Sequence, residues 1–117
     1  LIDDTYNANP DSSKKSIDLL SKYKKNTVLV IGDMLELGKY KKKLHRELGE
    51  YAKAKGINVV LGYGELTKET IKAFGKKGIF FDKEESLKDY LKINITSKDV
   101  ILIKGSRGMK MERFINV

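Results

Sequence analysis

The chain has 117 residues and a formal net charge of +8. Its length predicts one domain with a hydrophobic core. A content of 40% hydrophobic residues excludes an intrinsically disordered chain. The absence of cysteine excludes disulfides and thiolate metal sites and is typical of a reducing cytosol. No apolar run reaches the ~20 residues that a membrane span requires, and charge within the first few residues leads us to expect no signal peptide.

The first predicted elements are a strand over residues 1–5 and a helix from Asn9 to about residue 24. Asn9 is a favoured residue before a helix, and Pro10 suits the first helical position because its missing N–H costs nothing there. Apolar residues follow at helical spacing, namely Ile17, Leu20 and Tyr23. The chain lacks a starting Met and opens on this strand, so we expect a fragment of a longer protein.

Strands and helices alternate along the rest of the chain. Further strands are predicted over residues 26–31, 57–61, 79–81 and 100–103. Further helices are predicted over residues 40–55, 65–77, 84–92 and 109–115. We expect Gly56 and Gly78 to end the second and third helices, because glycine adopts the left-handed conformation that follows many helices.

This alternation predicts a parallel sheet with right-handed crossovers. We therefore expect an open, three-layer, doubly wound α/β domain of about five strands, Rossmann-like in the broad sense. A single domain over residues 1–117 is expected, with no linker or internal repeat. The continuous β-branched run at 26–31 is typical of a strand that is covered on both faces.

Ligands of such sheets bind outside the carboxyl ends of the strands. The five segments predicted at this edge are DDTYNANP, GDMLELG, GYGE, FDKEE and KGSRG. Three of them are rich in glycine, aspartate and asparagine, whereas the opposite edge has ordinary connectors such as KKN and KGIN. We therefore expect the functional residues at the carboxyl edge.

The KGSRG segment, residues 104–108, has the composition of an anion site. Its glycines allow the backbone to come close to a ligand, and the helix predicted after it would point free N–H groups at the same place. Lys104 and Arg107 add positive charge, and arginine can hold a carboxylate or a phosphate with two hydrogen bonds. A tight turn with solvent-facing charges remains the alternative.

The GDMLELG segment carries two carboxylates, Asp33 and Glu36. Such a pair can hold Mg²⁺ or act as acid and base, but the spacing is common by chance. A wall-forming role is favoured, with the segment anchored by three partly buried residues, Met34, Leu35 and Leu37.

His45 has no second His or Cys with which to form a metal site, so we expect a surface or packing role. The dinucleotide fingerprint is incomplete at GYGE, since its third glycine is absent. The chain also contains no G-x-x-x-x-G-K-[ST] sequence, so it cannot by itself hold a nucleoside triphosphate in the P-loop manner.

The positive charge raises the alternative of a basic nucleic-acid-binding module. Of the 24 basic residues, however, 21 are lysines spread over every predicted helix, and only Arg46, Arg107 and Arg113 are arginines. Base readout favours arginine, and stacking platforms need aromatic neighbours. Solvated lysine faces, with no nucleic-acid partner, are the favoured interpretation.

A receiver-like signalling domain is the second alternative. Asp3, Asp4 and Lys104 resemble the corners of such a phosphoacceptor site. That module also needs an acceptor Asp at the end of its third strand, where this chain reads LGYG. The alternative is therefore disfavoured.

Three edge segments together closely resemble the C-terminal domain of the Mur ligases. They are DDTYNANP at 3–10, GDMLELG at 32–38 with Leu44-His45 shortly after, and KGSRGMKME at 104–112. The similarity spans the whole chain in order. Within the family the segments resemble those of the member that adds D-alanyl-D-alanine to UDP-N-acetylmuramoyl-tripeptide.

The resemblance implies a bacterial, cytoplasmic three-domain ligase of peptidoglycan synthesis. A central P-loop domain, upstream of this chain, would hold most of the ATP and Mg²⁺. The peptide carboxylate would be activated as an acyl phosphate, and the amine of D-alanyl-D-alanine would attack it through a tetrahedral intermediate. This chain would close over the site against its own upstream domains and would be inactive alone, with no catalytic residue or metal ligand of its own.

The resemblance also implies roles for individual residues. Asp4 would contact the ribose of ATP, and Asn7 and Asn9 would face the nucleotide and its phosphates. The carboxylate of the dipeptide would be bound by Lys104, Gly105, Ser106 and Arg107, although a phosphate remains the alternative there. Asp33 and Glu36 would lie at the same edge as part of the site wall.

Overall fold

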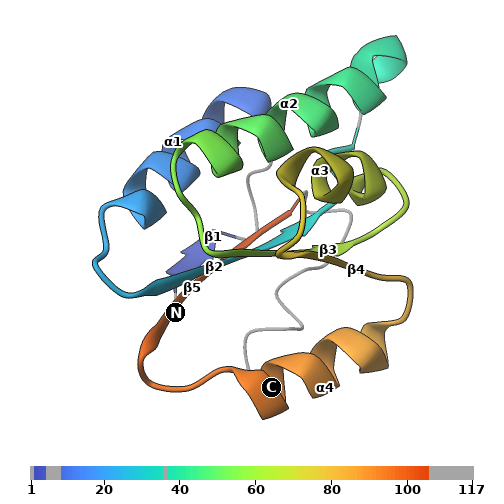
Figure 1. Cartoon of the computed structure of the whole chain (residues 1–117). Coiled ribbons are helices and arrows are strands. Elements are labelled where there is room, and N and C mark those ends of the chain that lie inside the picture. The colour runs from blue at the N-terminus through green and yellow to red at the C-terminus, as the bar shows by residue number, and fades with distance from the viewer. Residues whose placement is uncertain (1, 5–8, 36, 106–117) are drawn as a thin grey trace.

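A five-stranded parallel sheet forms the centre of the structure (Figure 1). The computed structural model describes residues 2–4, 9–35 and 37–105. Its strands are β1 (Ile2–Asp4), β2 (Asn26–Gly32), β3 (Val59–Tyr63), β4 (Gly78–Phe81) and β5 (Asp99–Lys104). The strand order is β1-β5-β2-β3-β4, and every neighbouring pair is parallel. The predicted fold class is confirmed, and the order, which the sequence left open, places the last strand between the first two.

The described helices cover both faces of the sheet, which gives the three layers that were predicted. They are α1 (Pro10–Ser21), the short 3₁₀ helix η1 (Gly38–Tyr40), α2 (Lys41–Ala54), α3 (Thr67–Phe74) and α4 (Glu84–Asn94). Figure 1 shows α1, α2 and α3 on one face and α4 on the other. The closing helix predicted over residues 109–115 lies outside the described residues.

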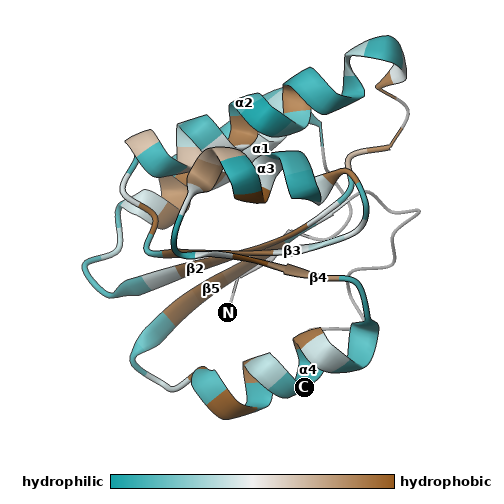
Figure 2. Ribbon diagram, turned by 45° about the vertical axis from the view of Figure 1, so that its right-hand side comes forward, coloured by the Kyte–Doolittle hydropathy of each residue, from teal (hydrophilic) through white to brown (hydrophobic). Residues whose placement is uncertain are grey.

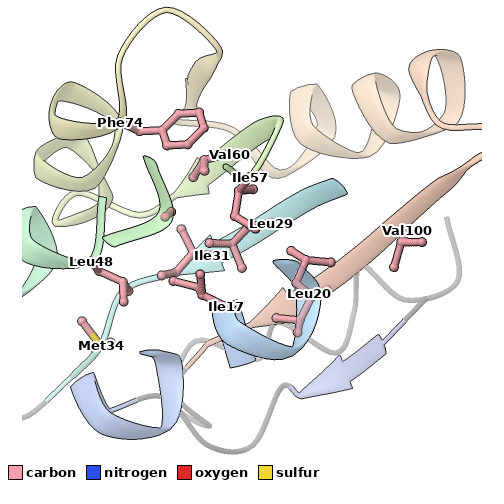
Figure 3. Packing of buried hydrophobic residues seen from close by; sticks show 12 residues of the cluster. Ile17, Leu20, Leu29, Ile31, Met34, Leu48, Ile57, Val60, Phe74 and Val100 are labelled. Atoms are coloured by element: carbon pink, nitrogen blue, oxygen red, sulfur yellow. The ribbon is translucent and has the colours of Figure 1, made fainter. Parts of the chain in front are cut away.

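Strand β2 is buried on both faces, as its continuous apolar sequence predicted. Leu29 and Ile31 belong to the core cluster under α1, α2 and α3 (Figure 3). Val28 and Val30 belong to the cluster under α4. Because successive side chains of a strand point to opposite faces, one apolar run supplies both layers of the core.

The helices are amphipathic. Figure 2 shows hydrophilic residues over much of their outer surfaces and hydrophobic residues along the sheet. Ile17 and Leu20 of α1, Leu48 of α2 and Phe74 of α3 are buried in the larger cluster, while Leu87 of α4 is buried in the smaller one. No helix in the described part of the chain is long and apolar enough to cross a membrane.

The end of α1 differs from the prediction. The helix stops at Ser21, three residues early, and the Ser21 hydroxyl donates to the Asp18 carbonyl at 2.7 Å. Tyr23 therefore lies beyond the helix and is exposed, not part of its apolar face as predicted. A hydroxyl that bonds a carbonyl within the last turn competes with continuation of the helix.

The end of α2 confirms the predicted role of Gly56 and explains a shift in the next strand. Gly56 has φ +77° and its N–H donates to the Lys53 carbonyl, while the Ile57 N–H donates to the Ala52 carbonyl. These two bonds form a Schellman motif. Ile57 thus belongs to the helix stop, and β3 begins at Val59, not at residue 57.

The stop predicted for the third helix is wrong. Gly75, with φ +106°, ends α3 after Phe74, and Gly78 is the first residue of β4. Two glycines three residues apart offered the same signal, and the first in the chain ends the helix. The helix is therefore shorter than the predicted span of 65–77.

Candidate functional site

The register of the strands brings together the strand ends that carry the predicted edge segments. Asp4 and Lys104 are partners at the ends of β1 and β5, and Lys104 is also the partner of Ile31 in β2. One position further along, Gly32 is paired with Tyr63 at the end of β3. The carboxyl ends of β1, β5, β2 and β3 therefore lie side by side at one edge, as the parallel arrangement requires.

Lys104 and Gly105 are both buried at this edge, and Lys104 is only 1% exposed. Lysine is almost never fully buried unless its charge is paired. The alternative of a turn with solvent-facing charges is thus wrong for Lys104. Ser106 and Arg107 lie outside the described residues, so the choice between carboxylate and phosphate at this loop stays a prediction.

The residues proposed to contact a nucleotide are placed only in part. Asp4 is the last residue of β1, at the same edge, and Asn7 lies outside the described residues. Asn9 is the N-cap of α1, as predicted, and its Oδ1 accepts from the Ser12 N–H at 2.9 Å. Phosphate oxygens accept hydrogen bonds, so a contact from Asn9 to a phosphate would use its amide nitrogen, which leaves the cap in place.

Asp33 follows β2 and reaches across the edge to α3. Its Oδ1 accepts from the Thr67 N–H at 3.1 Å, so it caps a helix that has no capping side chain of its own. The Asp33 carboxylate also lies over Gly64, where an added Cβ atom would come within 2.6 Å of Oδ1. Burial raises the pKa of the Asp33 carboxyl above its usual range, against the lowering influence of His45.

His45 is fully buried on α2 and holds the next residue of the same loop. The Met34 N–H donates to His45 Nε2 at 2.9 Å, and Nδ1 lies 2.7 Å from the Lys41 carbonyl oxygen. Burial lowers the pKa of the imidazole, against the raising influences of the Lys41 carbonyl, Asp33 and Glu69. Of the two roles predicted for this histidine, packing is correct.

Met34 is fully buried and is held from a third direction. The Ser13 hydroxyl of α1 donates to Met34 Sδ at 3.7 Å. Leu35, the next residue, is 38% exposed, and Leu37 is partly buried against the larger core cluster, as expected of a residue that anchors the loop. A pocket of about 510 Å³ opens over the loop, lined by Met34, Leu35, Leu37 and Gly38, by Lys39 and Lys41, and by Leu66.

Comparison with known proteins identifies the family. The family described as "Mur ligase, glutamate ligase domain" matches residues 1–107. The chain belongs to the Mur ligase family.

Curated Mur ligases are similar over almost the whole chain. The UDP-N-acetylmuramoyl-tripeptide–D-alanyl-D-alanine ligase of Haemophilus influenzae is 40% identical over 98% of the chain. The ligases of that name from Escherichia coli and Bacillus subtilis are 40% and 37% identical over the same share. The chain spans only about a quarter of the length of these relatives, 26–27%.

Solved Mur ligase structures share the fold. The MurF ligase of Thermotoga maritima, crystallised in complex with ADP, superposes with a TM-score of 0.82 at 30% identity, over 95% of this chain and 26% of that one. A MurF structure from Acinetobacter baumannii gives 0.80 at 26% identity, over 95% of this chain and 25% of that one.

Within this Mur ligase domain, Asp33 is engaged in capping α3, which suits a role in shaping the edge. Glu36 lies outside the described residues, and the described residues contain no group of three or more metal-ligating side chains. Sequence reasoning missed the contacts of Thr67 and Gly64 with Asp33. The only local signal was the glycine between Tyr63 and Glu65, which leaves room for a carboxylate.

Proposed function

We propose that this chain is the C-terminal domain of the ATP-dependent ligase that adds D-alanyl-D-alanine to UDP-N-acetylmuramoyl-tripeptide in the bacterial cytoplasm. The observation that carries the proposal is the 40% identity, over 98% of the chain, to curated ligases of that name. The edge of the sheet at which Asp4 and Lys104 are paired, beside the end of β2, supports it. The product would be the pentapeptide precursor of peptidoglycan.

ATP would be shared between this domain and the domains that precede it in the relatives. The Thermotoga maritima structure was determined with ADP, which is the product expected of ATP in such a ligase. In this chain, Asp4 at the end of β1 is proposed to contact the ribose, with Asn7 and Asn9 nearer to the phosphates. The chain has no P-loop, so we assign Mg²⁺ and most of the phosphate binding to the upstream domain.

The dipeptide would bind through its carboxylate at residues 104–107. Backbone N–H groups and the Arg107 guanidinium are the proposed donors, with Ser106 as a further contact. Arginine binds a carboxylate with two parallel hydrogen bonds, whereas lysine supplies only a point charge. Lys104, which is buried at the end of β5, is proposed as a further contact.

The test uses the complete ligase that carries this domain. Arg107→Ala should weaken the apparent affinity for D-alanyl-D-alanine by roughly one to two orders of magnitude, because a hydrogen bond to a charged group is worth about 1.5–3 kcal/mol. Arg107→Lys should be impaired as well, since it keeps the charge but loses the fork. If Arg107→Ala weakens ATP binding and leaves the dipeptide untouched, the loop binds a phosphate and this assignment is wrong.

The 117-residue chain by itself should not turn over. Phosphoryl transfer depends mainly on positioning the phosphates and the metal, and those groups are assigned to other domains. ATP-dependent phosphate release should therefore appear with the complete ligase and all three substrates, and be absent with this chain alone. Turnover by the chain at ordinary enzyme rates would contradict the proposed division of labour.

A further inference from the structure

The loop that follows β2 is fixed by contacts from three helices. The backbone of Met34 bonds to His45 of α2, the sulfur of Met34 accepts from Ser13 of α1, and Asp33 caps α3. We infer that His45 is a positioning residue: its hydrogen bond to the Met34 N–H fixes where the backbone of this loop lies at the carboxyl edge of the sheet. The expected effect of His45 on catalysis rests on the proposed function, whereas its hydrogen bond to the loop does not.

The two contacts of His45 determine which ring nitrogen carries the proton. The Met34 N–H can only donate, so Nε2 must accept and be unprotonated. The Lys41 carbonyl can only accept, so Nδ1 must carry the proton. The ring is therefore neutral and held in the Nδ1–H form. A protonated ring would direct a second N–H at the Met34 N–H and break the contact to the loop.

The support for His45 is itself rigid. The Thr70 hydroxyl of α3 donates to the His45 backbone carbonyl at 2.8 Å, and Thr70 is fully buried. Gly49, one turn further along α2, lies against the backbone of Thr70. The imidazole thus projects from a helix pair whose spacing is fixed, and the Met34 N–H is held relative to α3 as well as α2.

The loop held in this way faces outward into the pocket of about 510 Å³. Met34 and Leu35 belong to the lining of that pocket, and Lys39 and Lys41 add positive charge to it. Loss of the bond to His45 would leave the Met34 N–H buried without an acceptor, and the loop would shift to find one. A change of this kind alters the wall of the site without removing any group that touches a substrate.

Two amide substitutions separate the two contacts of His45. In glutamine the terminal atoms are attached to Cδ, so His45→Gln can place an acceptor close to the position of Nε2. In asparagine they are attached to Cγ, so His45→Asn can donate to the Lys41 carbonyl but cannot reach the Met34 N–H. The pair has the same chemistry and differs only in reach.

In the complete ligase, His45→Asn should lower kcat/KM for D-alanyl-D-alanine about tenfold, the effect expected of one buried donor left without a partner. His45→Gln should stay within about threefold of the wild type. The kcat/KM values of both variants are measured at temperatures below their unfolding midpoints and are expressed per folded molecule. KM for UDP-N-acetylmuramoyl-tripeptide is the control and should not change. Equal activities for the two variants, or a wild-type kcat/KM for His45→Asn, would overturn the positioning role.

Nuclear magnetic resonance of the 117-residue chain tests the structural content without any assay of activity. The His45 ring should show the Nδ1–H form with an unprotonated Nε2, and the Met34 amide should be protected from hydrogen exchange in the wild type and in His45→Gln but not in His45→Asn. An Nε2–H ring, or equal protection in all three proteins, would overturn the inference. If the complete wild-type ligase lacks activity while these signals are present, the proposed function fails instead.

Discussion

Gly49 of α2 lies directly against the backbone of α3, and it gives the sharpest stability prediction. A Cβ atom at this position would lie 2.2 Å from the Thr70 carbonyl oxygen and 3.0 Å from Ala73 Cβ. Real Cβ atoms do not come within 3.0 Å of such an oxygen, and no rotamer can move a backbone carbonyl away. Gly49→Ala must therefore push the two helices apart.

The cost can be estimated from two opposing effects. Overpacking a core costs about 1–3 kcal/mol, and the upper end applies because the clash is with backbone. Against this, alanine has a higher helix propensity than glycine, which stabilises the folded protein by about 1 kcal/mol. Gly49→Ala should thus lower the free energy of unfolding by about 2 kcal/mol, which corresponds to a fall in Tm of roughly 6–10 °C for a chain of this size.

Urea unfolding followed by far-UV circular dichroism measures this change directly. Glu50→Ala is the matched control, since Glu50 is the exposed neighbour on the same helix and its replacement should stay within about 0.5 kcal/mol of the wild type. A Gly49→Ala protein as stable as the wild type, or more stable, would refute the reasoning. The helix crossing would then be looser than the structure has it.

Three further changes test the loop contacts. Asp33→Asn keeps an acceptor for the Thr67 N–H. The pKa of the Asp33 carboxyl is raised above 3.8 in the folded protein, so the stabilising contribution of Asp33 is complete below pH 3.8 and is lost as pH rises through the folded pKa. In urea titrations, Asp33→Asn should therefore be more stable than the wild type at pH 7 but not at pH 3. Burial lowers the pKa of His45 below 6.5 in the folded protein, so the contribution of His45 to stability is complete above pH 6.5 and is lost as pH falls through the folded pKa. In His45→Gln, the free energy of unfolding should depend less on pH in that range. Asn9→Ala removes the cap of α1 and should cost about 1 kcal/mol in the same urea assay, whereas Asn9→Ser should restore most of it.

The fold class could be predicted because local signals agreed with one another. The apolar run of β2, the cap at Asn9 and the stop at Gly56 each act within a few residues of their own position. The errors also have local causes. Ile57 takes part in the Schellman motif that ends α2, so it does not begin β3. Helix α3 ends at the first of two nearby glycines, Gly75, and not at Gly78.

The candidate site was predictable only at the level of the edge. Parallel strands place their carboxyl ends together whatever their order, so the segments at 32–38 and 104–108 could be assigned to one edge. The contact of Asp33 with Thr67 joins residues 34 positions apart, and that of Met34 with His45 joins residues 11 apart. Such pairings depend on helix placement above the sheet, for which periodicity gives no information.

The position of β5 has a consequence for the synthesis of the chain on the ribosome. Among the described strands, β1 pairs only with β5, and Ile2 pairs with Leu102, 100 positions further along the sequence. Strands β2, β3 and β4 follow one another in both sequence and space, so they can assemble with α2 and α3 while translation continues. Of these five strands β1 is made first, but it must wait for β5, and closure of so long a loop is slow. Until then the flank of β2 that will receive β5 is an open strand edge, so a translational pause before residue 99 would prolong the interval in which the nascent chain is most prone to aggregate.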